Sequence, residues 1–174
     1  DTLLAITITA PPPFVVQGIV TDASCASACD GAIGVAVSGG TPGYSYAWSP
    51  NPGAGQGLPN ISGLCPGNWS VTVADMAGCD TMITFIVNTP PPLLLQLSTV
   101  DVSCTAVCDG EAILMVSGGT PGFSYLWSPA PASGQGTPNV SGLCAGPYTV
   151  LVSDIQGCDT TLTFTIIEPL PITA

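Results

Sequence analysis

The sequence predicts an all-β protein composed of two tandem sandwich domains, and three observations support this prediction. The chain repeats itself with a period of 79 residues, since Cys25 recurs at Cys104 and Trp48 recurs at Trp127. Apolar and polar residues alternate with the period of two that is typical of half-buried strands, and they nowhere sustain a helical period. The apolar runs are short and separated by turns rich in Gly and Pro. Such a pattern favours a two-layer sandwich in each repeat.

Two proline triplets mark the expected domain boundaries. Pro11–Pro13 and Pro90–Pro92 favour stiff polyproline II segments, which have no backbone N–H to donate to a sheet. We therefore expect domains joined by Pro-rich linkers, within a longer tandem array. The expected parts, in chain order, are the last strand of a preceding repeat at 1–10, repeat domains at 11–89 and 90–168, and the start of the next linker at 169–174.

Each repeat contains six short runs with the pattern of strands. In the last run of the first repeat, Ile83, Phe85 and Val87 share one face of the strand, because successive side chains alternate between faces. Leu162 and Phe164 copy this pattern in the second repeat. The strands expected in the first repeat are Phe14–Asp22, Ala32–Val37, Tyr44–Trp48, Leu58–Ile61, Trp69–Ala74 and Met82–Val87.

Glycine and proline positions predict the types of turn between these strands. Thr41–Tyr44 suits a type II turn, because Pro42 presets the first central residue and Gly43 supplies the positive φ of the second. Asp75–Gly78 has the composition of a hairpin turn in which the Asp side chain bonds to nearby backbone. Both turns recur one period later, so we expect the same connections in both repeats.

The composition excludes several classes of function. The chain has no Lys, Arg or His against eleven Asp and Glu, for a formal charge of −11. We expect no nucleic-acid partner, because nothing can neutralise phosphates. We expect no enzyme, because a nucleophile would lack a His or Lys base and only paired carboxylates remain for acid–base work, and we expect no cofactor. We also expect no membrane span, because the sequence has no apolar run of the ~18 residues that a spanning helix needs.

Eight cysteines, four in each repeat, indicate a disulfide-linked extracellular protein. Domains of this size bury only about 60% of their unfolded surface, so covalent links stabilise them appreciably. The alternative is a cytosolic metal site, but the C-x-x-C pairs and histidines of zinc sites are missing from the sequence.

One cysteine pairing in each repeat depends on the order of the strands. Cys65 and Cys79 flank one extended strand and lie about 20 Å or more apart, which is too far for a disulfide. If the strand order is immunoglobulin-like, the turn with Cys25 and Cys29 lies at the same end as the turn before Cys65. The disulfides that this order favours are Cys29–Cys65 and Cys108–Cys144.

The remaining cysteines leave two alternatives open. Cys25 pairs with Cys79 of its own repeat if the sandwich has six up-and-down strands, and this pairing is favoured. Alternatively, Cys25 pairs with Cys158 of the following repeat, which would link successive repeats covalently. The same choice applies to Cys104 through the 79-residue period.

Four aspartates recur in each repeat and are weak candidate ligands for calcium. In the first repeat they are Asp22, Asp30, Asp75 and Asp80. All four lie beside turns or cysteines, where capping of backbone N–H groups is the simplest role. Calcium is a weak alternative, because carboxylate oxygens suit this ion but no D-x-D-x-D-G loop occurs.

The aromatic residues allow a core role or a binding role. Trp48 and Trp69 are predicted to lie in the core, with Tyr44 and Tyr46 half exposed. The alternative is a face on which sugars stack.

Three blocks of the first repeat, and the same blocks in the second, resemble the SprB repeat family. The resemblance covers nearly the whole chain and rests on these blocks in a constant order. The matching blocks are Val37–Ser49, Leu64–Gly67 and Val71–Cys79, and then Val116–Ser128, Leu143–Gly146 and Val150–Cys158.

This resemblance implies an immunoglobulin-like sandwich at the cell surface. SprB repeats occur in long secreted surface proteins of Bacteroidota, among them gliding-motility adhesins exported by the type IX secretion system. The resemblance also implies an O-glycosylation acceptor of the form Asp-(Ser/Thr)-aliphatic or Thr, which marks Thr2, Thr81 and Thr160 as candidate sites on a glycoprotein. The alternative is that each Thr is the first residue of a strand.

The sequence thus predicts a structural module of a long extracellular repeat array, a disulfide-linked surface stalk or filament. Its expected partners are neighbouring repeats of the same protein, assembled into a fibre. The alternative is an adhesin module that binds carbohydrate or a cell surface through loops and exposed aromatic residues.

Overall fold

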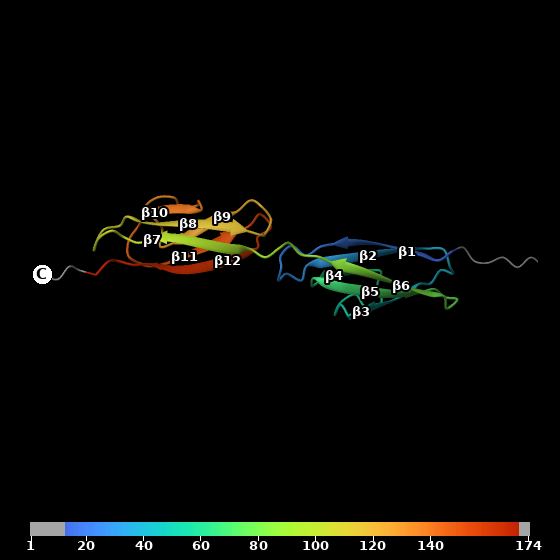
Figure 1. Ribbon diagram of the computed structural model, residues 1–174. Helices are drawn as coiled ribbons and strands as arrows, with labels where there is room; N and C mark the ends of the chain where they lie inside the picture. The colour runs from blue at the N-terminus through green and yellow to red at the C-terminus, as the bar shows by residue number, and fades with distance from the viewer. Residues whose placement is uncertain (1–12, 171–174) are drawn as a thin grey trace, which may run out of the picture. The chain divides into compact units, whose positions relative to one another are not determined.

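The computed structural model describes residues 13–170, which form twelve β-strands and no helix. The strands build four antiparallel sheets of three strands each (Figure 1). The predicted fold class is confirmed, because each repeat is an immunoglobulin-like sandwich of two such sheets.

The described residues divide into two compact units. One contains the residues up to Ala23 together with Ser27–Thr89, and the other contains Ser24–Ala26 together with the residues from Pro90 onward. The main division falls where the second proline triplet begins. The short segment Ser24–Ala26, by contrast, groups with the second unit and not with its sequence neighbours. The strand expected at 1–10 lies outside the described residues, as does most of the expected linker at 169–174.

The first unit pairs its strands in the orders β1-β2-β4 and β3-β5-β6. All pairings are antiparallel; β1–β2 and β5–β6 follow each other in the chain, whereas the chain crosses to the other sheet between β2 and β4 and between β3 and β5. The strands are β1 Val15–Thr21, β2 Gly31–Ser38, β3 Ser45–Ser49, β4 Asn60–Leu64, β5 Gly67–Ala74 and β6 Asp80–Val87.

The second unit repeats this topology as β7-β8-β10 and β9-β11-β12. Its registers copy those of the first unit one period later, for example Trp127↔Val150 after Trp48↔Val71. The strands are β7 Leu94–Val100, β8 Gly110–Ser117, β9 Ser124–Ser128, β10 Asn139–Leu143, β11 Gly146–Ser153 and β12 Asp159–Ile166.

Each unit has a core built from both of its sheets around one buried indole. Trp48 is 3% exposed and Trp127 is 1% exposed. In the first unit, Ile33 from β2 and Val71 from β5 belong to the same core as Trp48. The alternation predicted for β6 is also confirmed, since Phe85 and its neighbours two residues away on either side face this core.

The expected strand at Leu58–Ile61 is displaced toward the C-terminus. Leu58 belongs to a turn, because its N–H donates to the carbonyl of Gly55 (2.9 Å). Strand β4 begins at Asn60 and continues to Leu64 through a β-bulge at Gly63, whose φ of +72° is the left-handed conformation that glycine adopts without strain. Apolar alternation ends at Ile61, so the sequence pattern missed the bulged half of this strand.

Candidate functional site

Two disulfides close the equivalent ends of the two sandwiches. Cys29 is bonded to Cys65 and Cys108 to Cys144, each across a separation of 36 residues. Cys29 lies two residues before the start of β2 and Cys65 immediately follows β4, and Gly31↔Leu64 is the register pair next to the disulfide. The disulfides therefore extend an existing strand pairing, and they are the pairings that the strand order favours.

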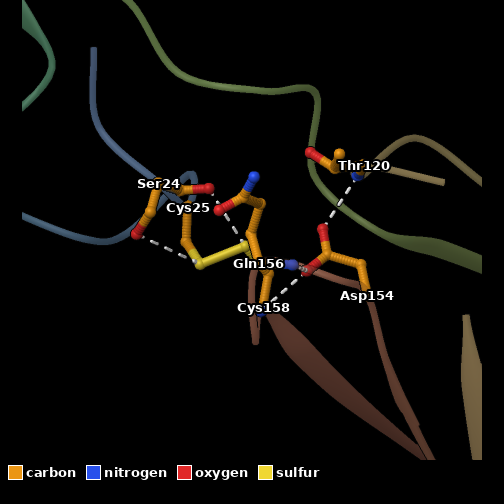
Figure 2. The surroundings of a disulfide bond; sticks show 6 residues. All are labelled: Ser24, Cys25, Thr120, Asp154, Gln156 and Cys158. Carbon is orange, nitrogen blue, oxygen red and sulfur yellow. Dashed lines mark hydrogen bonds between the residues drawn. A yellow bond between two sulfur atoms is a disulfide. The ribbon is translucent and has the colours of Figure 1, made fainter. Parts of the chain in front are cut away.

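The third disulfide joins Cys25 to Cys158, across a sequence separation of 133 and with a Cα–Cα distance of 5.5 Å (Figure 2). The favoured pairing of Cys25 with Cys79 is therefore wrong. Cys79 and Cys104 are exposed and free. In sequence terms, the third bond links the cysteine of one repeat to that of the next, and within the structure it lies in the second unit together with Ser24–Ala26.

The geometry of the first unit explains why Cys25 does not meet Cys79. The N–H of Ala23 donates to the carbonyl of Asn88 (2.9 Å), and Asp22 Oδ1 accepts from the N–H of Asn88 (2.8 Å). These contacts place the end of β1 beside the end of β6, whereas Cys79 precedes the start of β6. An eight-residue strand spans roughly 26 Å at ~3.3 Å per residue, so the two cysteines lie at opposite ends of the sandwich.

The turn that carries Cys158 is organised by a buried carboxylate. Asp154 Oδ1 accepts from the N–H groups of Cys158 and Gln156 (both 2.9 Å), and Oδ2 accepts from the N–H of Thr120 (2.8 Å; Figure 2). Asp154 is buried. These backbone donors, Thr120 foremost, lower the pKa of the Asp154 carboxyl although burial opposes them. The carboxylate thus holds Cys158 in place. The sulfur of Cys158 also lies 3.2 Å from the carbonyl oxygen of Ser24.

Asp75 forms the equivalent turn in the first repeat. Its Oδ1 accepts from the N–H of Cys79 (2.8 Å) and its Oδ2 from the N–H of Thr41 (2.9 Å). The N–H of Gly78, at a φ of +84°, donates to the Asp75 carbonyl (3.1 Å). The predicted hairpin turn is confirmed. Its aspartate also bonds to the Thr41–Tyr44 loop, 34 residues away.

The candidate calcium ligands do not gather at one place in the described residues. Asp75 is committed to its own turn, and Asp22 binds the backbone and side chain of Asn88. Asp30 is exposed after Cys29, and Asp80 is exposed at the first position of β6. Among residues 13–170, no group of three His, Cys, Asp or Glu side chains is arranged to hold a metal ion.

The aromatic residues are built into the cores. All three Trp, four Tyr and four Phe residues fall within the described part of the chain, and each is buried or half-buried. Trp48 and Trp69 are core residues, as predicted. Tyr44 is half-buried, and its hydroxyl donates to the carbonyl of Gly39 (2.6 Å). The predicted half exposure of Tyr44 and Tyr46 is confirmed.

The candidate glycosylation sites occupy one strand position. Thr81 and Thr160 are half-buried second residues of β6 and β12, on the face that their strands turn toward the core. Thr2 lies outside the described residues. Attachment of sugar stays a prediction, and the intact mass of the native protein tests it.

A glutamine that the sequence analysis did not single out protects an edge strand. Gln56 Oε1 accepts from the N–H of Trp48 (3.0 Å), and Gln56 Nε2 donates to the Trp48 carbonyl (3.3 Å). Gln135 does the same for Trp127. The side-chain amide therefore takes the place of a neighbouring strand beside β3 and β9, which are edge strands. The signal in the sequence was the Gly-Gln-Gly triplet, repeated at constant phase.

Surface hollows lie on corresponding faces of the two units. One of about 320 Å³ is lined by residues of β1, β2 and β4, including Gln17, Ile19 and Asn60. One of about 360 Å³ is lined by residues of β7 and β8, including Gln96 and Met115. Neither lining contains an ionisable side chain, so neither hollow offers acid–base chemistry.

The fold and its bonds define a class of protein, a tandem array of disulfide-linked immunoglobulin-like β-sandwich repeats. The SprB repeat family matches residues 18–53 and 97–132. The predicted resemblance is therefore confirmed, because the SprB repeat model matches one segment in each of the two repeats. SprB repeats together with disulfides point to an extracellular or cell-surface protein with an adhesin-like repeat module. Among the described residues, no helix has the length and apolar character needed to cross a bilayer.

Comparison with curated proteins found no match. Similar solved structures include a 282-residue C-terminal fragment of intimin in complex with the intimin-binding domain of the translocated intimin receptor (14% identity, 91% of this chain, 64% of that chain, TM-score 0.42). Another is the eight N-terminal Ig domains of the Down syndrome cell adhesion molecule isoform 1.30.30 (15% identity, 91% and 25% coverage, TM-score 0.41). A third is a Dscam structure that concerns isoform specificity (13% identity, 94% and 47% coverage, TM-score 0.35). These values carry no argument about function.

Proposed function

We propose that this chain is a structural module of a long extracellular repeat array, which forms a disulfide-linked surface stalk or filament. The observation that carries the proposal is the bond between Cys25 and Cys158. A disulfide between cysteines of successive repeats adds a second covalent connection to the peptide linker. Tension along the chain is then shared between linker and disulfide, which is the property that a stalk needs.

The charge pattern supports the same role. With no Lys, Arg or His, the chain has no side-chain salt bridges, so its cohesion rests on burial, backbone ladders and disulfides. Assembly of several chains would use apolar or neutral contacts, since facing carboxylates repel one another. The chain also offers no cleavage site to trypsin-like proteases, which suits exposure outside the cell.

Catalysis and sugar stacking have less support. We propose no enzymatic activity, because the eight cysteines and eleven acidic residues are the only candidate catalytic groups apart from Tyr and hydroxyl side chains. The alternative function, an adhesin module that binds carbohydrate through exposed aromatic residues, requires rings on the surface. Every aromatic side chain of the chain is at least half covered by protein.

Electron microscopy combined with a glycan array tests the proposal. The 174-residue chain, purified without reductant, is imaged and applied to the array, with the reduced and alkylated chain as the matched control. We expect the oxidised chain to form ordered fibres and to bind no glycan. The reduced and alkylated control should form no fibres. Glycan binding by particles that form no fibres would overturn the structural role in favour of the adhesin.

A further inference from the structure

The two free cysteines are the repeat equivalents of the two that are bonded to each other. Cys25 bonds to Cys158, and one period separates Cys25 from Cys104 and Cys79 from Cys158. Cys79 and Cys104 are both exposed. If the Cys25-type cysteine of each repeat bonds to the Cys79-type cysteine of the next repeat, two cysteines of the chain have no partner. These are the Cys79-type cysteine of the first repeat and the Cys25-type cysteine of the last, and Cys79 and Cys104 are indeed free.

The turn around Cys79 already has the geometry of the bonded turn around Cys158. The cysteine N–H lies 2.8 Å from Asp75 Oδ1 in the free turn and 2.9 Å from Asp154 Oδ1 in the bonded one. The aspartate N–H donates to the cysteine carbonyl at 2.9 Å in both. Bonding to a partner is therefore not needed to shape the turn, and Cys79 presents its sulfur from a preorganised support.

The loop around Cys104 is likewise held by its own contacts. The N–H of Ser103 donates to Asp109 Oδ1 (2.9 Å), and the N–H of Val107 donates to the carbonyl of Cys104 (3.3 Å). A bend followed by a turn occupies the same four positions as in the bonded loop that begins at Ser24. The free loop therefore bends and turns at the same positions as the bonded loop, but the backbones differ at Ala106, whose φ is +61°, whereas the equivalent Ser27 has no positive φ.

We propose that Cys104 and Cys79 are complementary half-sites that bond to further copies of this repeat. Cys104 takes the Cys79-type cysteine of the copy that follows, and Cys79 takes the Cys104-type cysteine of the copy that precedes. Each bond forms by thiol–disulfide exchange with a small-molecule disulfide such as oxidised glutathione. Two cysteine thiols are oxidised to one S–S bond, and one oxidised glutathione accepts the two electrons and two protons to become two reduced glutathiones.

The inference rests on the proposed function, because a stalk or filament supplies the further copies. It adds a direction to the array, since a bond between unlike half-sites is head to tail. Heterologous contacts of this kind propagate as an open filament unless the rotation between copies closes a ring. The proposal therefore excludes bonds between two Cys79 residues or between two Cys104 residues of different copies.

Two matched variants of the 174-residue chain test the proposal. The Cys79→Ser chain retains only the Cys104 half-site, and the Cys104→Ser chain retains only the Cys79 half-site. One is labelled with ¹⁵N, and both are mixed in a glutathione redox buffer. We expect a covalent heterodimer in about tenfold excess over either homodimer, because docking of complementary repeats raises the effective concentration of the two thiols.

The bond itself is mapped in non-reducing digests of the wild-type chain, light and ¹⁵N-labelled chains being mixed. Chymotrypsin is used because trypsin has no site. A Cys79–Cys104 peptide with one light and one heavy half is the expected product. A statistical mixture of homodimers and heterodimers, or a Cys79–Cys104 bond within one chain, would overturn the inference. If fibres form without glycan binding but no heterodimer appears, the inference about Cys79 and Cys104 is wrong and the proposed function stands. If the heterodimer appears but the chain binds glycan and forms no fibres, only the proposed function is rejected.

Discussion

The two repeats place different side chains beside the same buried indole. Gly18 of β1 in the first repeat corresponds to Leu97 of β7 in the second, and a Cβ at Gly18 would overlap the ring of Phe85. In the first repeat Phe85 is buried and tilted against Trp48 (38° between planes). In the second, Phe164 is half-buried and meets Trp127 edge-on at 89°. The exchange of Gly18 on β1 for Leu97 on β7 is thus accompanied by a different ring orientation, that of Phe164 on β12 instead of Phe85 on β6.

A second exchange, Trp69 to Tyr148, changes the ring but keeps a hydrogen bond to the backbone of a disulfide-bonded cysteine. Trp69 donates from Nε1 to the carbonyl of Cys65 (3.1 Å). The equivalent Tyr148 accepts from the N–H of Cys144 through its hydroxyl (3.1 Å), and its ring stacks on Phe164 at 22°. This position therefore requires an aromatic ring whose polar tip reaches the backbone of the cysteine four residues earlier. Either direction of hydrogen bond meets that requirement.

Core volume is also redistributed between the repeats. Ile33 becomes Ala112, and part of the lost volume is recovered elsewhere in the core, where Val35 becomes Leu114 and Val87 becomes Ile166. Both cores remain closed, and no buried side-chain N or O atom in the described residues lacks a hydrogen bond. The comparison teaches that the fold depends on total core volume and on polar partners more than on particular residues.

The largest expected effect is equal in the two repeats. Trp48→Ala and Trp127→Ala should each lower the free energy of unfolding by about 3–5 kcal/mol, because each indole fills its core and donates to the backbone. Urea unfolding, with hydrogen exchange to resolve the repeats, measures this. Leu126→Ala, at a residue 58% exposed, is the control. A core that tolerates the loss would show that the two indoles are not equivalent.

Exchanging the β1 residue tests the difference directly. Gly18→Leu should cost about 1–3 kcal/mol by crowding Phe85, and adding Trp69→Tyr should recover part of this cost as a coupling of about 0.5 kcal/mol or more. Chemical denaturation of the single and double variants gives the coupling. Ile19→Ser, which copies the exposed Ser98 of the second repeat, is the matched control. Strict additivity would mean that the ring positions adapt independently of each other.

Removing the edge-protecting glutamines should have a smaller and equal effect. Gln56→Ala and Gln135→Ala each leave the N–H and C=O of the edge tryptophan to water, for an expected loss of about 1 kcal/mol of unfolding free energy. Gln156→Ala copies Ala77 of the first repeat and serves as control. Static light scattering should also detect more association in both variants, because an unprotected edge strand can pair with another chain. Unchanged stability and association would contradict the role of these side chains.

The smallest difference between repeats is expected in their response to acid. Backbone donors, Thr41 and Thr120 foremost, lower the pKa of Asp75 and Asp154 below 3.8 in the folded protein. The stabilisation they supply is therefore present above pH 3.8 and is lost as the pH falls through the lower folded pKa. The stability advantage of the wild type over Asp75→Asn or Asp154→Asn should shrink below pH 3.8 to the same degree in both repeats.

Melting temperatures between pH 7 and pH 2 measure this response. Asp80→Asn removes an equal charge from an exposed position and controls for the relief of repulsion in this acidic chain. An advantage that persists at the lowest pH would show that the carboxylate charge does not hold the turns.

The sequence predicted the strands and turns because their signals are local. Alternation placed β6 with Phe85 inward, and Gly78 marked the hairpin before it. The bulge at Gly63 was missed, since the apolar alternation that reveals a strand stops there. Thr41 lies between strands, as predicted, but its bond to the buried Asp75 joins positions 34 residues apart and has no signal in either segment.

Residue type and spacing along the chain establish the repeat, most of its strands and the constant phase of its cysteines. The partner of Cys25, by contrast, depends on how the strands pack in three dimensions. Cys79 and Cys158 have the same neighbours, Gly before and Asp after, so no local feature separates them. The deciding fact is that β6 ends beside Ala23, so Cys79, which precedes the start of β6, lies at the far end of its own sandwich, and Cys158 is the cysteine within bonding distance.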